Sequence, residues 1–181
     1  FGPLSKTKAM NNFQKICEFH RTFGLPVSDL PQEGVLYTNI DLVNFRLALI
    51  KEEVGETREA LKSKDLVEIV DGLADTLYVA YGMAASFGID IDRIIRARFE
   101  NEYDGLTIFN FITESAHLSI HEVVPPVYEL LSGKMMEMHE LNIRNIENCY
   151  DRLVWVCIEE KDFWKIPHLL ANLIIETYYM G

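Results

Sequence analysis

Hydrophobic residues recur at helical spacing along almost the whole chain, whereas stretches of alternating apolar and polar residues are scarce. This pattern predicts an all-α protein built from several helices joined by short turns. Boundary signals agree with it, among them Gly88 after one helix and the pair Pro125-Pro126 before another. The expected helices cover residues 10–22, 40–62, 64–87, 90–103, 126–140, 142–159 and 161–180.

The connection at residues 25–38 contains two prolines and several polar residues and is predicted to be a loop. Its length is compatible with a flap over a functional site and equally with a plain surface connection. The sequence does not decide between the two.

A weak internal repeat relates residues 64–75 to residues 161–172, and both copies begin with Lys-Asp. Duplication of a helical unit and chance similarity between two apolar helices explain it equally well. In the second copy the acids are replaced by Lys165, His168 and Asn172. If the unit was duplicated, the C-terminal copy serves as scaffold.

The composition and charge of the 181-residue chain narrow the classes of function. Hydrophobic residues make up 49% and charged residues 25%, which excludes disordered and collagen-like proteins and fits one globular protein. The 28 acidic and 17 basic residues give a net charge of -11, which repels phosphate backbones and anionic lipids. We therefore expect neither nucleic acid nor membrane as a partner, and a phosphate-bearing ligand would need cations as intermediaries.

Cysteine usage and hydropathy bear on the compartment. Cys17, Cys149 and Cys157 show no C-x-x-C spacing, which fits a reducing compartment better than a disulfide framework. The longest uncharged stretch, Thr76 to Ile89, is shorter than the roughly 20 apolar residues that span a bilayer. It is predicted to be a buried helix. Because no secretion signal is visible, we expect a cytoplasmic protein.

Two acidic runs on consecutive predicted helices carry the candidate chemistry. The first has the pattern E-E-x-x-E at residues 52–56, and the second spans residues 68–75. At helical spacing Glu53 and Glu56 project within about 60° of each other, and Glu68, Asp71 and Asp75 fall within a similar arc. Because the turn at Ser63-Lys64 is short, the helices should pack antiparallel and bring the acids together. The candidates are Glu52, Glu53 and Glu56 on the first helix, and Glu68, Asp71 and Asp75 on the second.

The surroundings of these acids predict that they bind a cation. The second helix is apolar nearly all round, so Asp75 should not reach water easily, and Glu53 and Glu56 should point toward the core. Clustered carboxylates shielded from water are costly unless they take up protons or bind a cation. An oxygen-rich cluster suits Mg²⁺ or Mn²⁺, which bridge to phosphates. For the glutamates of the first helix, the alternative is an ordinary solvated helix face.

These segments resemble the all-α nucleoside triphosphate pyrophosphatases, the MazG-like superfamily that includes dimeric dUTPases and phosphoribosyl-ATP pyrophosphohydrolases. That family carries E-E-x-x-E on one helix and E-x-x-D on the next, which residues 45–56 and 73–82 match here. Upstream, residues 18–21 (Glu-Phe-His-Arg) followed by Gly24 resemble the first helix of dUTPase-related members. The likeness covers about residues 13–100 and implies an antiparallel helical bundle, to which the C-terminal half would add a degenerate second unit.

The resemblance also implies a reaction, in which water attacks a nucleoside triphosphate and releases nucleoside monophosphate and pyrophosphate with the help of Mg²⁺ or Mn²⁺. Glu52 matches the extra acid of the family and is the candidate to take the proton of the attacking water. Where the family has the Glu of E-x-x-D, this chain has Gly72, so Asp71 or Glu68 would supply the missing carboxylate. The implied metal ligands are Glu53, Glu56, Asp71, Asp75 and Glu68, and the candidate phosphate partners are Lys51, Arg46 and Arg58.

In this reading a metal-binding catalytic unit occupies residues 10–105, and a C-terminal helical extension at residues 106–181 packs on it. Residues 1–9 have the character of a tag or a disordered end. The resemblance further implies a homo-oligomer, either a dimer or a dimer of dimers, and a role in clearing nucleotide pools.

Other functions stay open. The chain could keep the fold as an inactive helical oligomerisation or metal-binding module, because Gly72 and the acidic stretch at residues 100–104 depart from the family pattern. A di-iron bundle would need two Glu-x-x-His pairs, and only Glu114 with His117 fits that spacing. His117 and His121 could bind zinc but lack an H-E-x-x-H motif. His20 and His168 are equally consistent with hydrogen-bonded core positions.

Overall fold

The computed structural model describes residues 10–102 and 125–181. Predictions that concern residues 1–9, Glu114, His117 and His121 lie outside these ranges. In the described part every regular element is helical, so the predicted all-α class is confirmed. The α-helices are α1 (Asn12–Thr22), α2 (Val35–Thr38), α3 (Ile40–Ser63), α4 (Leu66–Phe87), α5 (Ile91–Glu102), α7 (Pro125–Trp155) and α8 (Ile166–Met180), with a π-helical turn Val156–Glu160 and a 3₁₀ turn Phe163–Lys165 before α8.

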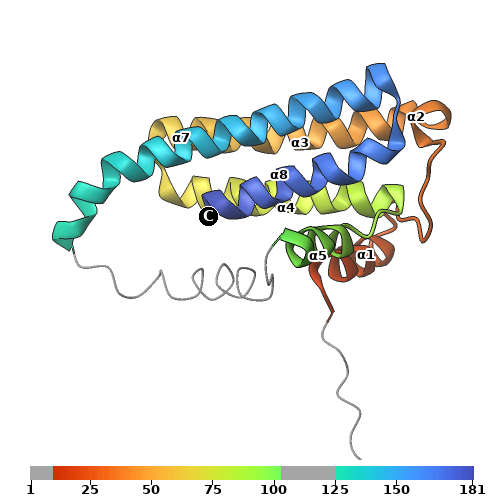
Figure 1. The fold of residues 1–181 in the computed structure, drawn as a ribbon, viewed down its shortest axis with the longest axis horizontal. Helices are drawn as coiled ribbons and strands as arrows, with labels where there is room; N and C mark the ends of the chain where they lie inside the picture. The colour runs from red at the N-terminus through yellow and green to blue at the C-terminus, as the bar shows by residue number, and fades with distance from the viewer. Residues whose placement is uncertain (1–9, 103–124) are drawn as a thin grey trace, which may run out of the picture.

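Two antiparallel helical hairpins form the body of the protein (Figure 1). Helix α3 pairs with α4 and α7 pairs with α8, and the second hairpin lies along the first so that α7 contacts α3 and α8 contacts α4. Helices α1 and α5 pack against each other, α1 against α4 and α5 against α8. The core lies between the hairpins and includes Leu47, Ile50, Leu153 and Leu170, each at most 5% exposed. No helix in the described ranges combines the length and apolar character needed to cross a bilayer.

The turns of the two hairpins are built alike. Lys64 ends α3 with a left-handed φ of 57°, and Lys161 ends the α7 segment with a φ of 52°. Each lysine is followed by an aspartate whose side chain accepts hydrogen bonds from backbone N–H groups of the next helical segment, Asp65 from Val67 and Asp162 from Trp164. The repeat seen in the sequence therefore extends to the backbone conformation of the two turns, and duplication of the helical unit stays a hypothesis.

Two parts of the fold differ from the predicted elements. Residues 126–140 and 142–159 were predicted as separate helices, but α7 continues through both because the junction near Leu141 contains neither glycine nor proline. The loop at residues 25–38 contains the short helix α2 and is tied to the end of α4 by backbone bonds from Ser28 to Ala85 and from Gln32 to Phe87, both 2.9 Å. This anchoring favours a plain connection over a flap.

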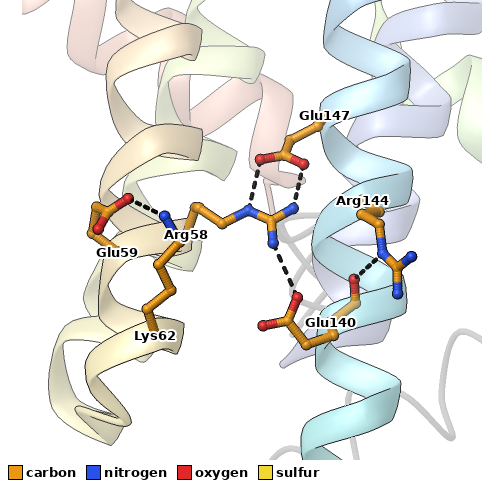
Figure 2. Close-up of polar contacts among 6 residues, drawn as sticks. All are labelled: Arg58, Glu59, Lys62, Glu140, Arg144 and Glu147. Carbon is orange, nitrogen blue, oxygen red and sulfur yellow. Dashed lines mark hydrogen bonds and ion pairs between the residues drawn. The ribbon is translucent and has the colours of Figure 1, made fainter.

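An ion-pair cluster joins the two hairpins (Figure 2). The Arg58 guanidinium on α3 donates from Nε to Glu147 on α7 at 2.7 Å, and a second nitrogen pairs with the other oxygen of the same carboxylate. Its remaining nitrogen reaches Glu140 at 3.0 Å. The Arg58 side chain is only 18% exposed, and the paired glutamates raise its pKa. This forked pairing fixes the register of α3 against α7.

We expect Arg58→Met to lower the free energy of unfolding by about 1–2 kcal/mol, because it leaves two half-buried carboxylates without their shared cation. Urea denaturation followed by circular dichroism measures the change. Lys62→Met is the matched control, since Lys62 pairs with Glu59 on the open surface and its loss should cost less than about 0.5 kcal/mol. Equal effects of the two substitutions would contradict a joining role for Arg58.

Candidate functional site

The α3–α4 hairpin brings the predicted acids together. Burial and four neighbouring carboxylates raise the pKa of Glu53 above its usual range. Asp75 has the strongest influence of the four, although it lies on α4 and Glu53 lies on α3. The antiparallel pairing predicted from the short turn is therefore present, and it gathers five carboxylates: Glu52, Glu53, Glu56, Asp71 and Asp75.

These carboxylates are more exposed than their sequence context predicts. Glu53 is half-buried, whereas Asp75 and Glu56 are exposed to solvent. The expectation that Asp75 is shielded from water is wrong. Asp75 is exposed because the first half of α4 has a side that no other helix in the described ranges covers. Two apolar residues on this side, Val67 and Val70, are 76% and 60% exposed. The site is an open surface between two helices, and its exposed acids can rotate toward a ligand.

Asp71 and Glu68 are the two candidates for the carboxylate that the family motif has where this chain has Gly72, and their surroundings differ. Asp71 is among the charges that raise the pKa of Glu53, and Glu68 is not. Glu68 lies in the first turn of α4, where its backbone N–H is capped by Asp65. Asp71 therefore acts on Glu53, whereas Glu68 does not, and the role of either acid as a metal ligand stays a prediction.

Gly72 has a packing role that explains the departure from the family pattern. A Cβ at this position would lie 2.5 Å from Thr57 Oγ1 and 3.2 Å from Thr57 Cα on α3. Thr57 itself is buried, and its hydroxyl donates to the Glu53 carbonyl at 2.9 Å. Gly72 thus allows α3 and α4 to approach closely directly beside the acids.

The charge of this cluster is not compensated by the described part of the chain. None of the five carboxylates forms an ion pair there. Like charges at such positions repel, and a hard divalent cation with oxygen ligands would relieve this repulsion. As the side chains stand, no three His, Cys, Asp or Glu groups among the described residues are grouped closely enough to hold a metal ion. The donor set suits Mg²⁺ or Mn²⁺, and binding requires rotation of the exposed acids.

The three candidate phosphate partners occupy different environments. Lys51 is exposed on α3 and forms no ion pair within the described ranges. Arg58 is directed to α7, where Glu140 and Glu147 hold it, so the structure does not bring it to the acids. Arg46 is 3% exposed and lies in the interior of the hairpin.

The two predicted core histidines also differ. His20 is fully buried, and its Nδ1 is 3.2 Å from the Pro26 carbonyl, as a hydrogen-bonded core histidine should be. His168 is exposed on α8, which contradicts a core position. The solvent-facing side of α8 at this turn was not recognisable from its largely apolar sequence.

An all-α bundle with an E-E-x-x-E helix paired to an aspartate-bearing helix defines the class of the all-α nucleotide pyrophosphatases. Comparison with known families agrees with this class. Residues 16–98, from α1 into α5, match the phosphoribosyl-ATP pyrophosphohydrolase family (PRA-PH). That family is a member of the MazG-like superfamily, so the resemblance found in the sequence is confirmed for residues 16–98.

A viral protein gives a further comparison. An uncharacterised protein of Acanthamoeba polyphaga mimivirus is 43% identical over 89 residues, which cover 49% of this chain and 36% of the viral protein. The chain thus matches about a third of the length of that relative. No solved structure matches the chain.

Proposed function

We propose that this protein hydrolyses nucleoside triphosphates to nucleoside monophosphates and pyrophosphate in the presence of Mg²⁺ or Mn²⁺. The observation that carries the proposal is the uncompensated cluster around Glu53, which lies within the residues that match the PRA-PH family. An acidic protein with charge -11 can hold a triphosphate only if cations neutralise the phosphates. Clearing nucleotide pools is the role that follows from this reaction.

In this proposal Glu53, Glu56, Asp71 and Asp75 hold the metal ions, with Glu68 as a further acid one turn away. The bound cations would neutralise the triphosphate and acidify a water molecule. Glu52 is exposed at the edge of the cluster and takes the proton of that water as general base. Lys51, next to it on α3, is free to approach the outer phosphates.

The test is pyrophosphate release from a panel of standard and modified ribo- and deoxyribonucleoside triphosphates, with Mg²⁺, Mn²⁺ or EDTA. We expect metal-dependent release that both Glu53→Gln and Asp75→Asn abolish. Glu59→Gln is the matched control, because Glu59 lies on the same helix but pairs with Lys62 instead of joining the cluster. Equal loss in the control would show that the cluster is not specific.

Phosphoribosyl-ATP is the second candidate substrate, because the matched family carries that compound in its name. It therefore belongs in the same panel. An absence of release from every compound, by folded protein that still binds Mn²⁺, would leave the inactive metal-binding or oligomerisation module as the function.

We further propose that the protein forms a homo-oligomer, a dimer or a dimer of dimers, through the uncovered side of α4. Leu66, Val67 and Val70 are 61%, 76% and 60% exposed there, which is unusual for adjacent apolar residues of one chain. Val67→Glu is expected to shift the protein to monomer in light scattering after size exclusion, without loss of helicity. An unchanged mass would place the contact elsewhere, and Lys15→Glu on α1 is the control for added negative charge.

A further inference from the structure

His20 on α1 and Arg46 on α3 form a buried polar pair whose hydrogen-bonding capacity is not used. His20 Nε2 has no partner among the residues that the structure describes, and neither have Arg46 Nε and Nη2. Both side chains are well over nine-tenths buried, at 0% and 3% exposure. A buried guanidinium without an acceptor is costly, so its presence requires an explanation.

Both side chains converge on Gly82 of α4. A Cβ at Gly82 would lie 3.0 Å from Arg46 Nη1 and 3.3 Å from His20 Nε2. The absence of a side chain at Gly82 therefore lets both groups pack directly against the backbone of α4. Burial, together with the charge of Arg46, lowers the pKa of His20, so the imidazole is neutral at pH 7. With Nδ1–H donating to Pro26, Nε2 is then a hydrogen-bond acceptor.

Aromatic rings surround the pair and are open to solvent. Phe19, Phe23 and Phe45 are 44%, 65% and 53% exposed. The Phe45 ring centroid is 5.6 Å from the Arg46 guanidinium, and Tyr78 meets the rings of both His20 and Phe19 edge-on. Exposed phenylalanines disfavour a hydrated phosphate but provide faces on which a planar heteroaromatic ring stacks.

The pair lies in register with the acid cluster. Arg46 precedes Glu53 by seven residues on α3, and Gly82 follows Asp75 by seven on α4. Seven residues are about two helical turns, so each pair of positions shares one helix face at a separation of about 10 Å. A ligand with phosphates at the acids would therefore place its other end at Arg46 and His20.

We propose that Arg46 and His20 bind the nucleobase of the substrate and select bases that carry a carbonyl oxygen (uracil, thymine, cytosine, guanine, hypoxanthine) over adenine. The inference rests on the proposed function and extends it to the substrate class. Arg46 can only donate, and adenine, which has no carbonyl oxygen, offers it only ring nitrogens as acceptors. His20 Nε2 accepts from a ring N–H or an amino group. The surface rings of Phe19, Phe23 and Phe45 shift to admit the base and stack on it.

The experiment uses Arg46→Met, with Arg144→Met as the matched control, because Arg144 is exposed and, among the described residues, its side chain donates only to the Glu140 carbonyl of its own helix. Calorimetry measures the binding of UMP, CMP, GMP and AMP, and pyrophosphate release gives kcat/KM for the four triphosphates. We expect at least about a tenfold preference over adenine in the wild type, lost in Arg46→Met and kept in Arg144→Met.

A second readout separates a binding role from a structural one. Without ligand, Arg46→Met should melt at the same or a higher temperature than the wild type, because it removes an unpaired buried charge. UMP should raise the melting temperature of the wild type but not of Arg46→Met. Gly82→Ala, which keeps the charge but displaces the ends of the Arg46 and His20 side chains, should weaken UMP binding as well.

Three results would overturn the inference: AMP binding as tightly as UMP, an unchanged preference in Arg46→Met whatever its melting temperature, or no binding of any monophosphate. If the protein does not hydrolyse nucleoside triphosphates, the result is different. Monophosphate binding still shows a base preference that depends on Arg46, but no triphosphate releases pyrophosphate. An adenine-derived substrate such as phosphoribosyl-ATP, if preferred, would also overturn the inference while leaving the hydrolase proposal intact.

Discussion

Glu53→Gln is expected to reduce pyrophosphate release by about two to three orders of magnitude, the cost of losing one essential electrostatic contact in an active site. Glu53 is central to the acid cluster, since four carboxylates influence its pKa and its side chain is half-buried between α3 and α4. Glutamine preserves its size but lacks the charge that a divalent cation requires. Initial rates at saturating Mg²⁺ measure the effect.

Glu53→Gln is expected to lower activity but to raise stability. This combination distinguishes a metal ligand from a residue that only supports the fold. Without divalent cations, Glu53→Gln removes like-charge repulsion and should raise the melting temperature. Millimolar Mg²⁺ should stabilise the wild type through binding to the folded state and stabilise the variant much less. A variant that is less stable than the wild type in EDTA would show that Glu53 has a structural role, and its lost activity would then have another cause.

Gly72→Ala is expected to destabilise the protein by about 1–3 kcal/mol, the usual cost of forcing an extra carbon into a packed interior. The added Cβ would lie 2.5 Å from Thr57 Oγ1, and the backbone of α3 is close behind it at 3.2 Å. Thr57 cannot turn away without breaking its hydrogen bond to the Glu53 carbonyl. Guanidinium denaturation at constant pH measures the change.

Gly55→Ala provides the matched control for this prediction. Gly55 lies on α3 inside the same motif, but a Cβ there would meet nothing within 4 Å. Alanine should therefore stabilise the helix by about 0.5–1 kcal/mol through its better helix propensity. If both substitutions stabilise the protein, α3 and α4 are not in close contact at Gly72, and the explanation of the motif departure fails.

Much of the fold could be predicted from the sequence because its signals are local. Helical periodicity, the Asp65 cap and the short turn at Lys64 define the α3–α4 hairpin, and the hairpin dictates that Glu53 meets Asp75. The continuity of α7 across Leu141 was missed, since a boundary was assigned where no helix-breaking residue stands. The function of the gathered acids as metal ligands stays a prediction.

The remaining features depend on contacts between distant residues. Apolar composition predicted that Asp75 is buried, but composition does not reveal which side of α4 is left uncovered, and there Val67 and Val70 face solvent. Arg58 was a candidate phosphate partner because it is basic and near the acids in sequence. Its pairing with Glu147, 89 residues later, leaves no local signal. The same holds for the approach of His20 and Arg46 to Gly82.

The position of Arg58 has a consequence for how the chain can be divided. The PRA-PH match ends at residue 98, before α7 and α8 begin. Yet α7 and α8 cover α3 and α4, and Arg58 is fastened to α7 only two residues after Glu56. The end of the family match is therefore not a folding boundary. A fragment cut there would keep every proposed metal ligand but lose α7, the surface against which α3, the helix that carries Glu53 and Glu56, is held.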